Sequence, residues 1–207
     1  FRESPQRRIV MLKVGVTGGI GSGKSAASIR MEELGAYRFD ADKEAKEILN
    51  ENEQVQEDLI EEFSSDILNP DRMINSKKLA RVAFANDENQ AVLNAIIHPH
   101  VFESIDRQYG KVLEKGEASL FVVDAALIYE SGLDQHLDYV IVVTVQYGLR
   151  MQRALKRGKL KRDQIQKRMD LQLPEEAKVH MADFIIDNSG SEEHLIMQVD
   201  EIYSQIT

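Results

Sequence analysis

The feature that most constrains this chain is a glycine cluster placed directly after a short β-branched run. The run spans residues 12–17, and the cluster reads Gly18-x-x-x-x-Gly23-Lys24-Ser25. Glycines let the backbone curl so that successive N–H groups point inward at an anion. A helix that follows such a cluster offers its positive N-terminal end to the same anion. The pattern therefore predicts a strand, a phosphate-binding loop and a helix, in that order.

Each part of this loop has an expected task in nucleotide binding. Lys24 would reach the β- and γ-phosphates, and the hydroxyl of Ser25 would be a ligand of Mg²⁺. A dinucleotide-binding turn is excluded because no Gly-x-Gly-x-x-Gly can be drawn through the cluster. The residues predicted to contact the nucleotide are Gly18, Gly19, Ile20, Gly21, Ser22, Gly23, Lys24, Ser25 and Ala26.

The remaining apolar runs predict an α/β fold. Strand-like runs lie near residues 36–39, 120–124, 139–144 and 184–187, with helical patterns between them. Continuous apolar strands separated by helices indicate a parallel sheet that is buried on both faces. We therefore expect a phosphate-loop kinase-like sheet of about five strands, flanked by helices.

Residues 43–118 contain no strand-like run and are expected to form a helical insertion. Helices are predicted at 41–50, 54–63, 77–84, 88–97 and 101–114, with His98-Pro99 separating the last two. The expected core consists of residues 11–42, 119–149 and 174–207, and residues 150–173 are expected to form a lid. Residues 1–10 precede Met11 and are expected to be a leader or a cloning remnant.

Composition excludes several classes of partner and chemistry. The 207 residues carry a net charge of −9, so nucleic acid and anionic membranes are not expected partners. The absence of cysteine excludes disulfides, thiolate zinc sites and thiol nucleophiles. No apolar run is long enough to span a bilayer and no signal peptide is recognisable. We expect a cytoplasmic monomer or small homo-oligomer.

Basic residues gather in the segment expected to form the lid. Arg153 and Arg157 are four residues apart, which places them on one face of a helix. Two guanidinium groups on one face suit a triphosphate. A solvated helical face with surface salt bridges is the alternative interpretation. Gly158 interrupts the helical pattern and favours a mobile lid.

Carboxylates follow the second and third predicted strands. Asp40 and Asp42 lie where ligands of open α/β sheets bind, and one of them could accept the proton of an acceptor hydroxyl. Asp40 could instead cap the next helix, and Asp42 could be a first-turn acid. Asp124 is a candidate ligand of Mg²⁺, directly or through water, or a cap at the end of its strand.

The remaining motifs favour a small kinase over other phosphate-loop proteins. A GTPase would need Asn-Lys-x-Asp, which is absent, and the only Asp-x-x-Gly lies at 187–190, after the last strand. A small kinase needs the loop, a group that orients the acceptor hydroxyl, and arginines on the transferred phosphoryl. All three parts have candidates here. His98 and His100 are two residues apart, but without a third ligand nearby a structural histidine at a helix end is favoured over a metal site.

Five segments together resemble the dephospho-coenzyme A kinase family over nearly the whole chain. The loop at 17–25 is the most specific of them. The others are Asp-Ala-Asp at 40–42, the His-Pro segment at 93–99, Leu-Ile-Tyr-Glu at 127–130 and the Asp-Asn ending at 182–188. Two positions depart from the family pattern: Ala126 stands where proline is usual, and Ala26 stands where threonine is common.

The resemblance implies the final step of coenzyme A synthesis. In that step the γ-phosphoryl of ATP is transferred, with Mg²⁺, to the ribose 3′-hydroxyl of dephospho-CoA. It implies catalytic roles for Thr17 and Asp42 beside Lys24, with Asp42 as the base or orienting group. It implies that Arg153 contacts phosphates with Arg157 as its lid companion, and that the insertion with His98 receives the acceptor beside Asp40. A kinase of another small metabolite and a non-catalytic ATP-binding switch are the alternatives.

Overall fold

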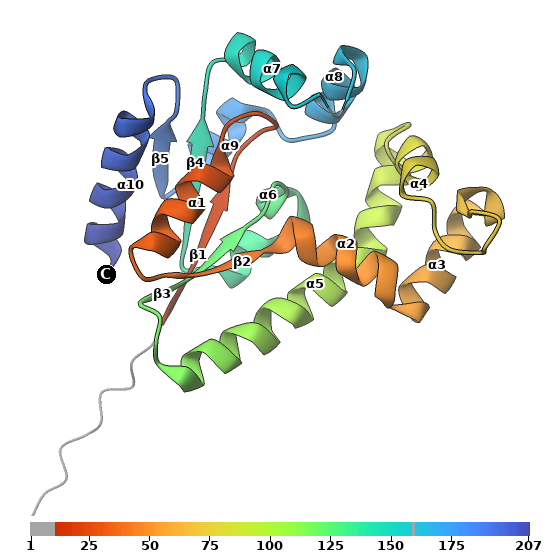
Figure 1. Cartoon of the computed structure of the whole chain (residues 1–207), viewed down its shortest axis with the longest axis horizontal. Coiled ribbons are helices and arrows are strands. Elements are labelled where there is room, and N and C mark those ends of the chain that lie inside the picture. Colours follow the sequence, from red (N-terminus) through yellow and green to blue (C-terminus); the bar gives the residue numbers. More distant parts are fainter. Residues whose placement is uncertain (1–10, 159) are drawn as a thin grey trace, which may run out of the picture.

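A five-stranded sheet forms the centre of the protein, in a computed structural model that describes residues 11–158 and 160–207 (Figure 1). All four pairings are parallel, and the strand order is β2-β3-β1-β4-β5. The strands are β1 (Leu12–Thr17), β2 (Tyr37–Asp40), β3 (Leu120–Asp124), β4 (Tyr139–Thr144) and β5 (Phe184–Asp187). The predicted parallel α/β sheet is confirmed. The expected leader at residues 1–10 lies outside the described residues.

Alternation along the central strands gives the sheet two apolar faces. Val14 and Val16 of β1 belong to a buried cluster with α1 (Lys24–Glu33) and α10 (Glu192–Ile206). Phe121 and Val123 of β3 point into a second cluster, which includes α2 (Ala41–Glu51) and α5 (Asp87–Lys115). Helices therefore cover both faces, as Figure 1 shows.

The remaining helices lie in the insertion and in the connections that follow β3 and β4. Between α2 and α5 are α3 (Glu53–Phe63), η1 (Ser65–Ile67) and α4 (Ser76–Ala83). After β3 come α6 (Ile128–Ser131) and η2 (Leu133–His136), and after β4 come α7 (Tyr147–Lys156), α8 (Arg162–Asp170) and α9 (Glu175–Met181). In Figure 1, α3 and α4 lie at one end of the molecule, and α7 and α8 lie above the carboxyl ends of the strands.

The predicted break at His98-Pro99 is wrong, because α5 runs without interruption from Asp87 to Lys115 with Pro99 inside it. Proline removes one backbone hydrogen bond and costs a helix interior about 3 kcal/mol. Leu93, Ile97 and Val101 are spaced four apart around the proline, and all three are buried in the core. Packing of this apolar stripe outweighs the lost hydrogen bond, and His98 therefore lies within a helix rather than at its end.

The parallel register gathers the functional ends of the strands at one edge. Asp40 at the end of β2 is paired with Asp124 at the end of β3. Thr17 ends β1 beside them, and Thr144 of β4 is paired with Asp187 of β5. The predicted phosphate loop, the acidic residues and the segment predicted to be the lid all follow strands at this edge. Among the described residues, no helix has both the length and the apolar composition needed to cross a membrane.

Candidate active site

The predicted phosphate loop connects the end of β1 to the first turn of α1. Gly21 and Gly23 have φ angles of 83° and 89°, a left-handed conformation that favours glycine. The side-chain amide of Asn188, which follows β5, donates to the carbonyl of Ser22 at 2.7 Å, and a Cβ at Gly23 would collide with that amide. The curved backbone predicted for Gly18–Ser25 is therefore held by a residue from the far end of the chain.

Lys24 lies between two carboxylates at the start of α1. Its Nζ is 2.8 Å from Oδ2 of Asp42 and 2.5 Å from Oδ1 of Asp124. Burial alone would lower the pKa of Lys24, but the two carboxylates outweigh burial and raise it above its ordinary value. The ammonium is thus charged and positioned at the edge of the sheet where the predicted phosphate site lies.

Asp124 is almost fully buried, with 1% of its side chain exposed. Its Oδ2 accepts from Ser28 at 2.7 Å and from Arg38 at 2.6 Å, and its Oδ1 accepts from Lys24. Burial would raise the pKa of this carboxyl, but the charges and hydrogen bonds of Lys24, Ser28 and Arg38 together lower it. Both oxygens of Asp124 are therefore occupied by protein donors.

The two residues of the Asp-x-Asp pair have different surroundings. Asp40 is the N-cap of α2, where Oδ1 accepts from the backbone of Lys43 at 2.9 Å, and Oδ2 is 3.2 Å from Arg38. The capping alternative for Asp40 is thus seen in the structure. Asp42 has 42% of its side chain exposed, pairs with Lys24 and lines a large cavity. Of the two carboxylates, Asp42 is therefore the one that lines this cavity.

Thr17 and Asp42 are both hydrogen-bonded to the backbone of Ala126. The hydroxyl of Thr17 donates to the Ala126 carbonyl at 3.3 Å, and the Ala126 N–H donates to Oδ1 of Asp42 at 3.3 Å. A proline at this position, which the family pattern has, could not supply that N–H. Because residue 126 is alanine in this chain, its backbone N–H is available to donate to Asp42.

A cavity of about 670 Å³ lies between the sheet edge, the insertion and the lid segment. Leu79, Leu93 and Phe102 make much of its wall apolar, and Asp42 and His98 add polar groups. The ring of His98 stacks on that of Phe102, with centroids 6.1 Å apart and an angle of 10° between the planes. Burial lowers the pKa of His98, an effect that Glu130 partly offsets. An acceptor with apolar and ring portions would fit such walls.

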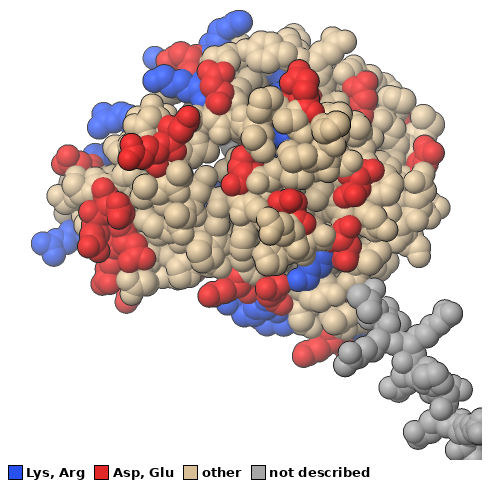
Figure 2. Space-filling view, turned by 180° about the vertical axis from the view of Figure 1, so that it is seen from behind, with Lys and Arg blue, Asp and Glu red and all other residues tan. Residues whose placement is uncertain are grey.

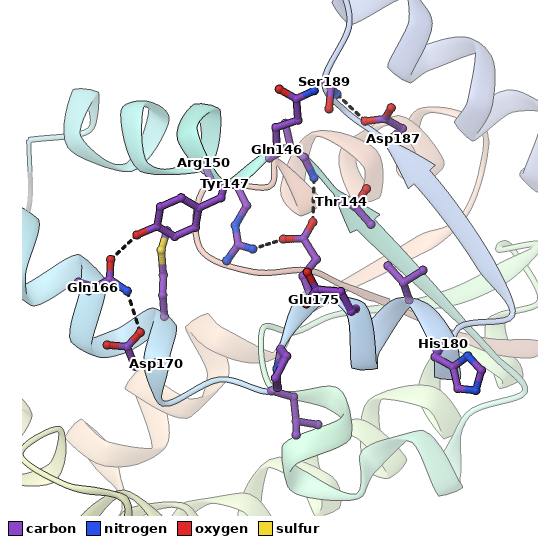
Figure 3. A pocket seen from close by; sticks show the side chains of 16 residues that line it. Thr144, Gln146, Tyr147, Arg150, Gln166, Asp170, Glu175, His180, Asp187 and Ser189 are labelled. Carbon is purple, nitrogen blue, oxygen red and sulfur yellow. Dashed lines mark hydrogen bonds and ion pairs between the residues drawn. The ribbon is translucent and has the colours of Figure 1, made fainter.

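A second cavity, of about 680 Å³, lies between the ends of β4 and β5 and helices α7, α8 and α9 (Figure 3). Arg150 and Glu175 form a partly buried ion pair in its wall, and Nε of Arg150 donates to the carbonyl of Ile20 at 3.3 Å. A Cβ at Gly19 would collide with the guanidinium of Arg150. Arg150, at the start of the segment predicted to be the lid, therefore contacts the phosphate loop directly.

The two predicted lid arginines lie at the C-terminal end of α7. Arg153 has a buried Nη1 without a hydrogen-bond partner among the described residues. Arg157 is the C-cap residue of α7, so the helix ends one residue before it, and Arg157 lines the same cavity as Asp42. Arg157 is exposed, and Ala26 is exposed on the first turn of α1. Figure 2 shows several Lys and Arg side chains at the upper left of the molecule and carboxylates scattered over a face that is otherwise mostly uncharged.

Several residues of the site were not predicted. Arg38 could have been noticed, because it precedes Asp40 by two residues in a strand and so shares its face. Asn188 follows β5 at the edge where all the strands end, which is a second usable signal. No local pattern marks Ser28, Arg150 or Lys178, since their roles arise from contacts with residues that are distant in sequence.

The sheet order, the loop after β1 and the basic segment after β4 together define a phosphate-loop kinase. The family model for dephospho-CoA kinase matches residues 12–194, and the chain belongs to that family. The family resemblance stated from the sequence motifs is thereby confirmed.

Curated relatives and solved structures agree with this assignment. Dephospho-CoA kinases of Corynebacterium efficiens and Aquifex aeolicus are 37% and 36% identical, over 95% of this chain and 98% of theirs. Protein TT1252 of Thermus thermophilus has a TM-score of 0.80 at 27% identity, and dephospho-CoA kinase from Campylobacter jejuni has 0.59 at 28%; both comparisons cover 95% of this chain and 98% of the other. A shikimate kinase from Acinetobacter baumannii, 12% identical with a TM-score of 0.54 and covering 95% of this chain and 94% of that one, shares the fold.

Proposed function

We propose that this protein transfers the γ-phosphoryl group of ATP to the ribose 3′-hydroxyl of dephospho-CoA, with Asp42 as the group that receives the hydroxyl proton. One observation carries the proposal. The carboxylate of Asp42 is 2.8 Å from the ammonium of Lys24 and also lines the large cavity of the insertion. A single carboxylate is thereby adjacent to the phosphate loop and to the place where an acceptor would enter.

The reaction needs few protein groups because phosphoryl transfer depends mainly on positioning and charge. The acceptor oxygen forms a bond to the γ-phosphorus while the bond from the γ-phosphorus to the β,γ-bridging oxygen breaks. The hydroxyl proton passes to Asp42, and ADP leaves with the bridging oxygen. Lys24 would offset the negative charge on the phosphoryl oxygens, and the loop N–H groups would hold the β-phosphate.

We assign one cavity to each of the two substrates. The cavity that contains Asp42 is assigned to dephospho-CoA, whose ring and chain portions suit its mixed walls, with His98 and Arg157 beside them. The cavity beside β4 and β5 then remains for the nucleoside part of ATP. Arg153 and Arg157 are assigned to the phosphates, an assignment that the unpartnered Nη1 of Arg153 supports. Binding of the acceptor by Asp40 remains a prediction.

Magnesium fits the oxygen donors of this edge. Mg²⁺ prefers hydroxyl, carboxylate and water oxygens, and it would shield charge on the phosphates when bound. Ser25 lies in the first turn of α1, and Asp124 is at the end of β3 with both oxygens already hydrogen-bonded. Ser25 is therefore the direct ligand in this proposal and Asp124 acts through water, an arrangement that needs no cluster of protein ligands. The cytoplasmic location and the monomeric or small oligomeric state remain predictions from the sequence.

Replacing Asp42 tests the assignment of the proton acceptor. Asp42→Asn keeps the size of the side chain but removes its basicity, so we expect kcat to fall by about 10²- to 10⁴-fold. The affinity for ATP, measured by calorimetry, should change much less. Glu47→Gln is the matched control because it removes an exposed carboxylate from the same helix. A kcat for Asp42→Asn near that of the control would contradict the proposal.

A further inference from the structure

Lys178 is a lysine with almost no solvent exposure that the proposed reaction does not use. It lies on α9, its side chain is 1% exposed, and its Nζ is 2.7 Å from Oε1 of Glu130, which is 12% exposed. Lysine is almost never fully buried unless it is paired, and withdrawing both charges from water is costly. A buried pair of this kind is therefore weak evidence for stability and calls for another role.

The second contact of Lys178 leads to the centre of the site. Its Nζ donates to the carbonyl of Ala126 at 3.3 Å. The same carbonyl accepts from the hydroxyl of Thr17, and the N–H of Ala126 donates to Asp42. The backbone of Ala126 therefore contacts two of the residues predicted to be catalytic, Thr17 and Asp42, and its carbonyl also accepts from the buried ammonium of Lys178.

Glu130 extends the same chain of contacts to the lid segment. Oε1 of Glu130 accepts from the N–H of Leu173 at 2.9 Å, in addition to its bond with Lys178. Leu173 lies at the end of the segment predicted to be the lid, just after α8. One carboxylate oxygen thus joins α6, α9 and the end of the lid, while the other is buried without a partner among the described residues.

We propose that Lys178 and Glu130 are positioning residues for phosphoryl transfer. They hold the backbone of Ala126 between Thr17 and Asp42 and connect it to the end of the lid at Leu173. The inference rests on the proposed function of Asp42. It follows that loss of Lys178 should disturb the orientation of a carboxylate that is otherwise 42% exposed, while the phosphate loop itself stays intact.

The first test is kinetic. In Lys178→Met we expect kcat to fall by about tenfold or more, because small misplacements of a reacting group are costly. The dissociation constant for ATP should stay within about twofold, since Lys178 makes no contact with the loop. Lys178→Arg keeps the charge and the donors and should recover most of the rate. A folded Lys178→Met protein with native kcat would overturn the inference.

A second variant separates positioning from folding. Lys178→Met alone leaves Glu130 buried without a cation, so its loss of activity could reflect instability. Lys178→Met/Glu130→Met replaces the pair by apolar side chains of similar length and should recover the melting temperature. Its kcat should stay low, because nothing restores the bond to the Ala126 carbonyl. Recovery of kcat together with stability would show a purely structural role and overturn the proposal.

Hydrogen exchange tests the same contacts without any acceptor. The amides of Ala126 and Leu173 donate to Asp42 and Glu130, and in Lys178→Met both should exchange at least about tenfold faster than in the native protein. Unchanged exchange at Ala126 would overturn the inference. This readout does not depend on which acceptor is phosphorylated. Failure of the proposed function, seen as native protein that does not turn over dephospho-CoA, is therefore distinguishable from failure of the positioning role.

Discussion

Lys24 carries the central charge of the site, because its ammonium faces Asp42 and Asp124 together. The same ammonium is the one predicted to meet the phosphates. Lys24→Met keeps the length of the side chain and removes the charge, so we expect kcat to fall by about 10³-fold.

The measurement is the steady-state rate of ADP release at saturating ATP and acceptor. Lys111→Met is the control, since Lys111 is exposed on α5 and lines a separate cavity with Tyr37, the first residue of β2. A near-native rate for Lys24→Met would show that the charge of this lysine has no part in transfer.

His98 gives the protein a pH-dependent term in its stability. Burial lowers the pKa of His98 below its ordinary value of 6.5, so the unfolded chain binds a proton there more readily than the folded one does. This contribution to stability is therefore fully present above pH 6.5 and is lost as the pH falls through the lowered pKa. In His98→Gln the decrease in the free energy of unfolding between neutral and mildly acidic pH should be smaller.

Urea unfolding at several pH values measures this effect. His194→Gln is the control, because it removes an exposed histidine from α10. If His98→Gln shows the native slope with pH, the buried imidazole is not the group responsible.

At the level of single residues, the sequence indicated candidates where the pattern is local. Lys24 follows the glycine spacing of a phosphate loop, and Asp42 follows a strand at the sheet edge where ligands of open α/β sheets bind. The structure brings these two side chains together, and their roles stay predictions. Lys178 could not be found in this way, because its partners Glu130 and Ala126 lie about fifty residues earlier in the chain. Its burial depends on the packing of α9, which no local pattern reveals.

Among the elements, the long helix α5 shows most clearly how packing can override local propensity. Pro99 destabilises its helix by about 3 kcal/mol relative to alanine. It also restricts the unfolded chain, which offsets up to about 1 kcal/mol of that destabilisation. Pro99 is exposed, so its removal leaves no cavity. In Pro99→Ala we therefore expect the free energy of unfolding to rise by about 2 kcal/mol.

Chemical denaturation measures this difference. A lower free energy of unfolding in Pro99→Ala would mean that the proline fixes a bend that the core requires. The matched control is Ala95→Gly, at an exposed position one turn earlier, which should be destabilised by about 1 kcal/mol if the helix there is regular.

All five strands were predictable. Four of them are short and mostly apolar runs, and β2 alternates aromatic with charged side chains. The helices after β4 were not resolved in advance, since α8 and α9 are short and polar and the basic residues were read as one lid segment. The structure shows that both ends of this segment contact the phosphate loop. Arg150 at one end of that segment and Gln172 at the other both bond to Ile20, through its carbonyl and its N–H at 3.3 Å.

The whole molecule joins its parts through shared apolar clusters. One buried cluster contains Val55 and Leu59 of α3 together with Phe121 of β3, so the helices of the insertion and the sheet share a core. The ring of Tyr109 on α5 meets that of Phe121 at 5.5 Å between centroids, nearly edge-on at 82°. This packing fixes the wall of the acceptor cavity relative to the phosphate loop.

The most direct test of the proposed function is phosphoryl transfer by the native protein. ADP release from Mg-ATP should be measured with dephospho-CoA, with AMP, adenosine and shikimate, and without an acceptor. We expect rapid turnover with dephospho-CoA alone, and the product should carry the new phosphate on the ribose 3′-hydroxyl. Turnover with another acceptor but not with dephospho-CoA, or ATP binding without any transfer, would contradict it.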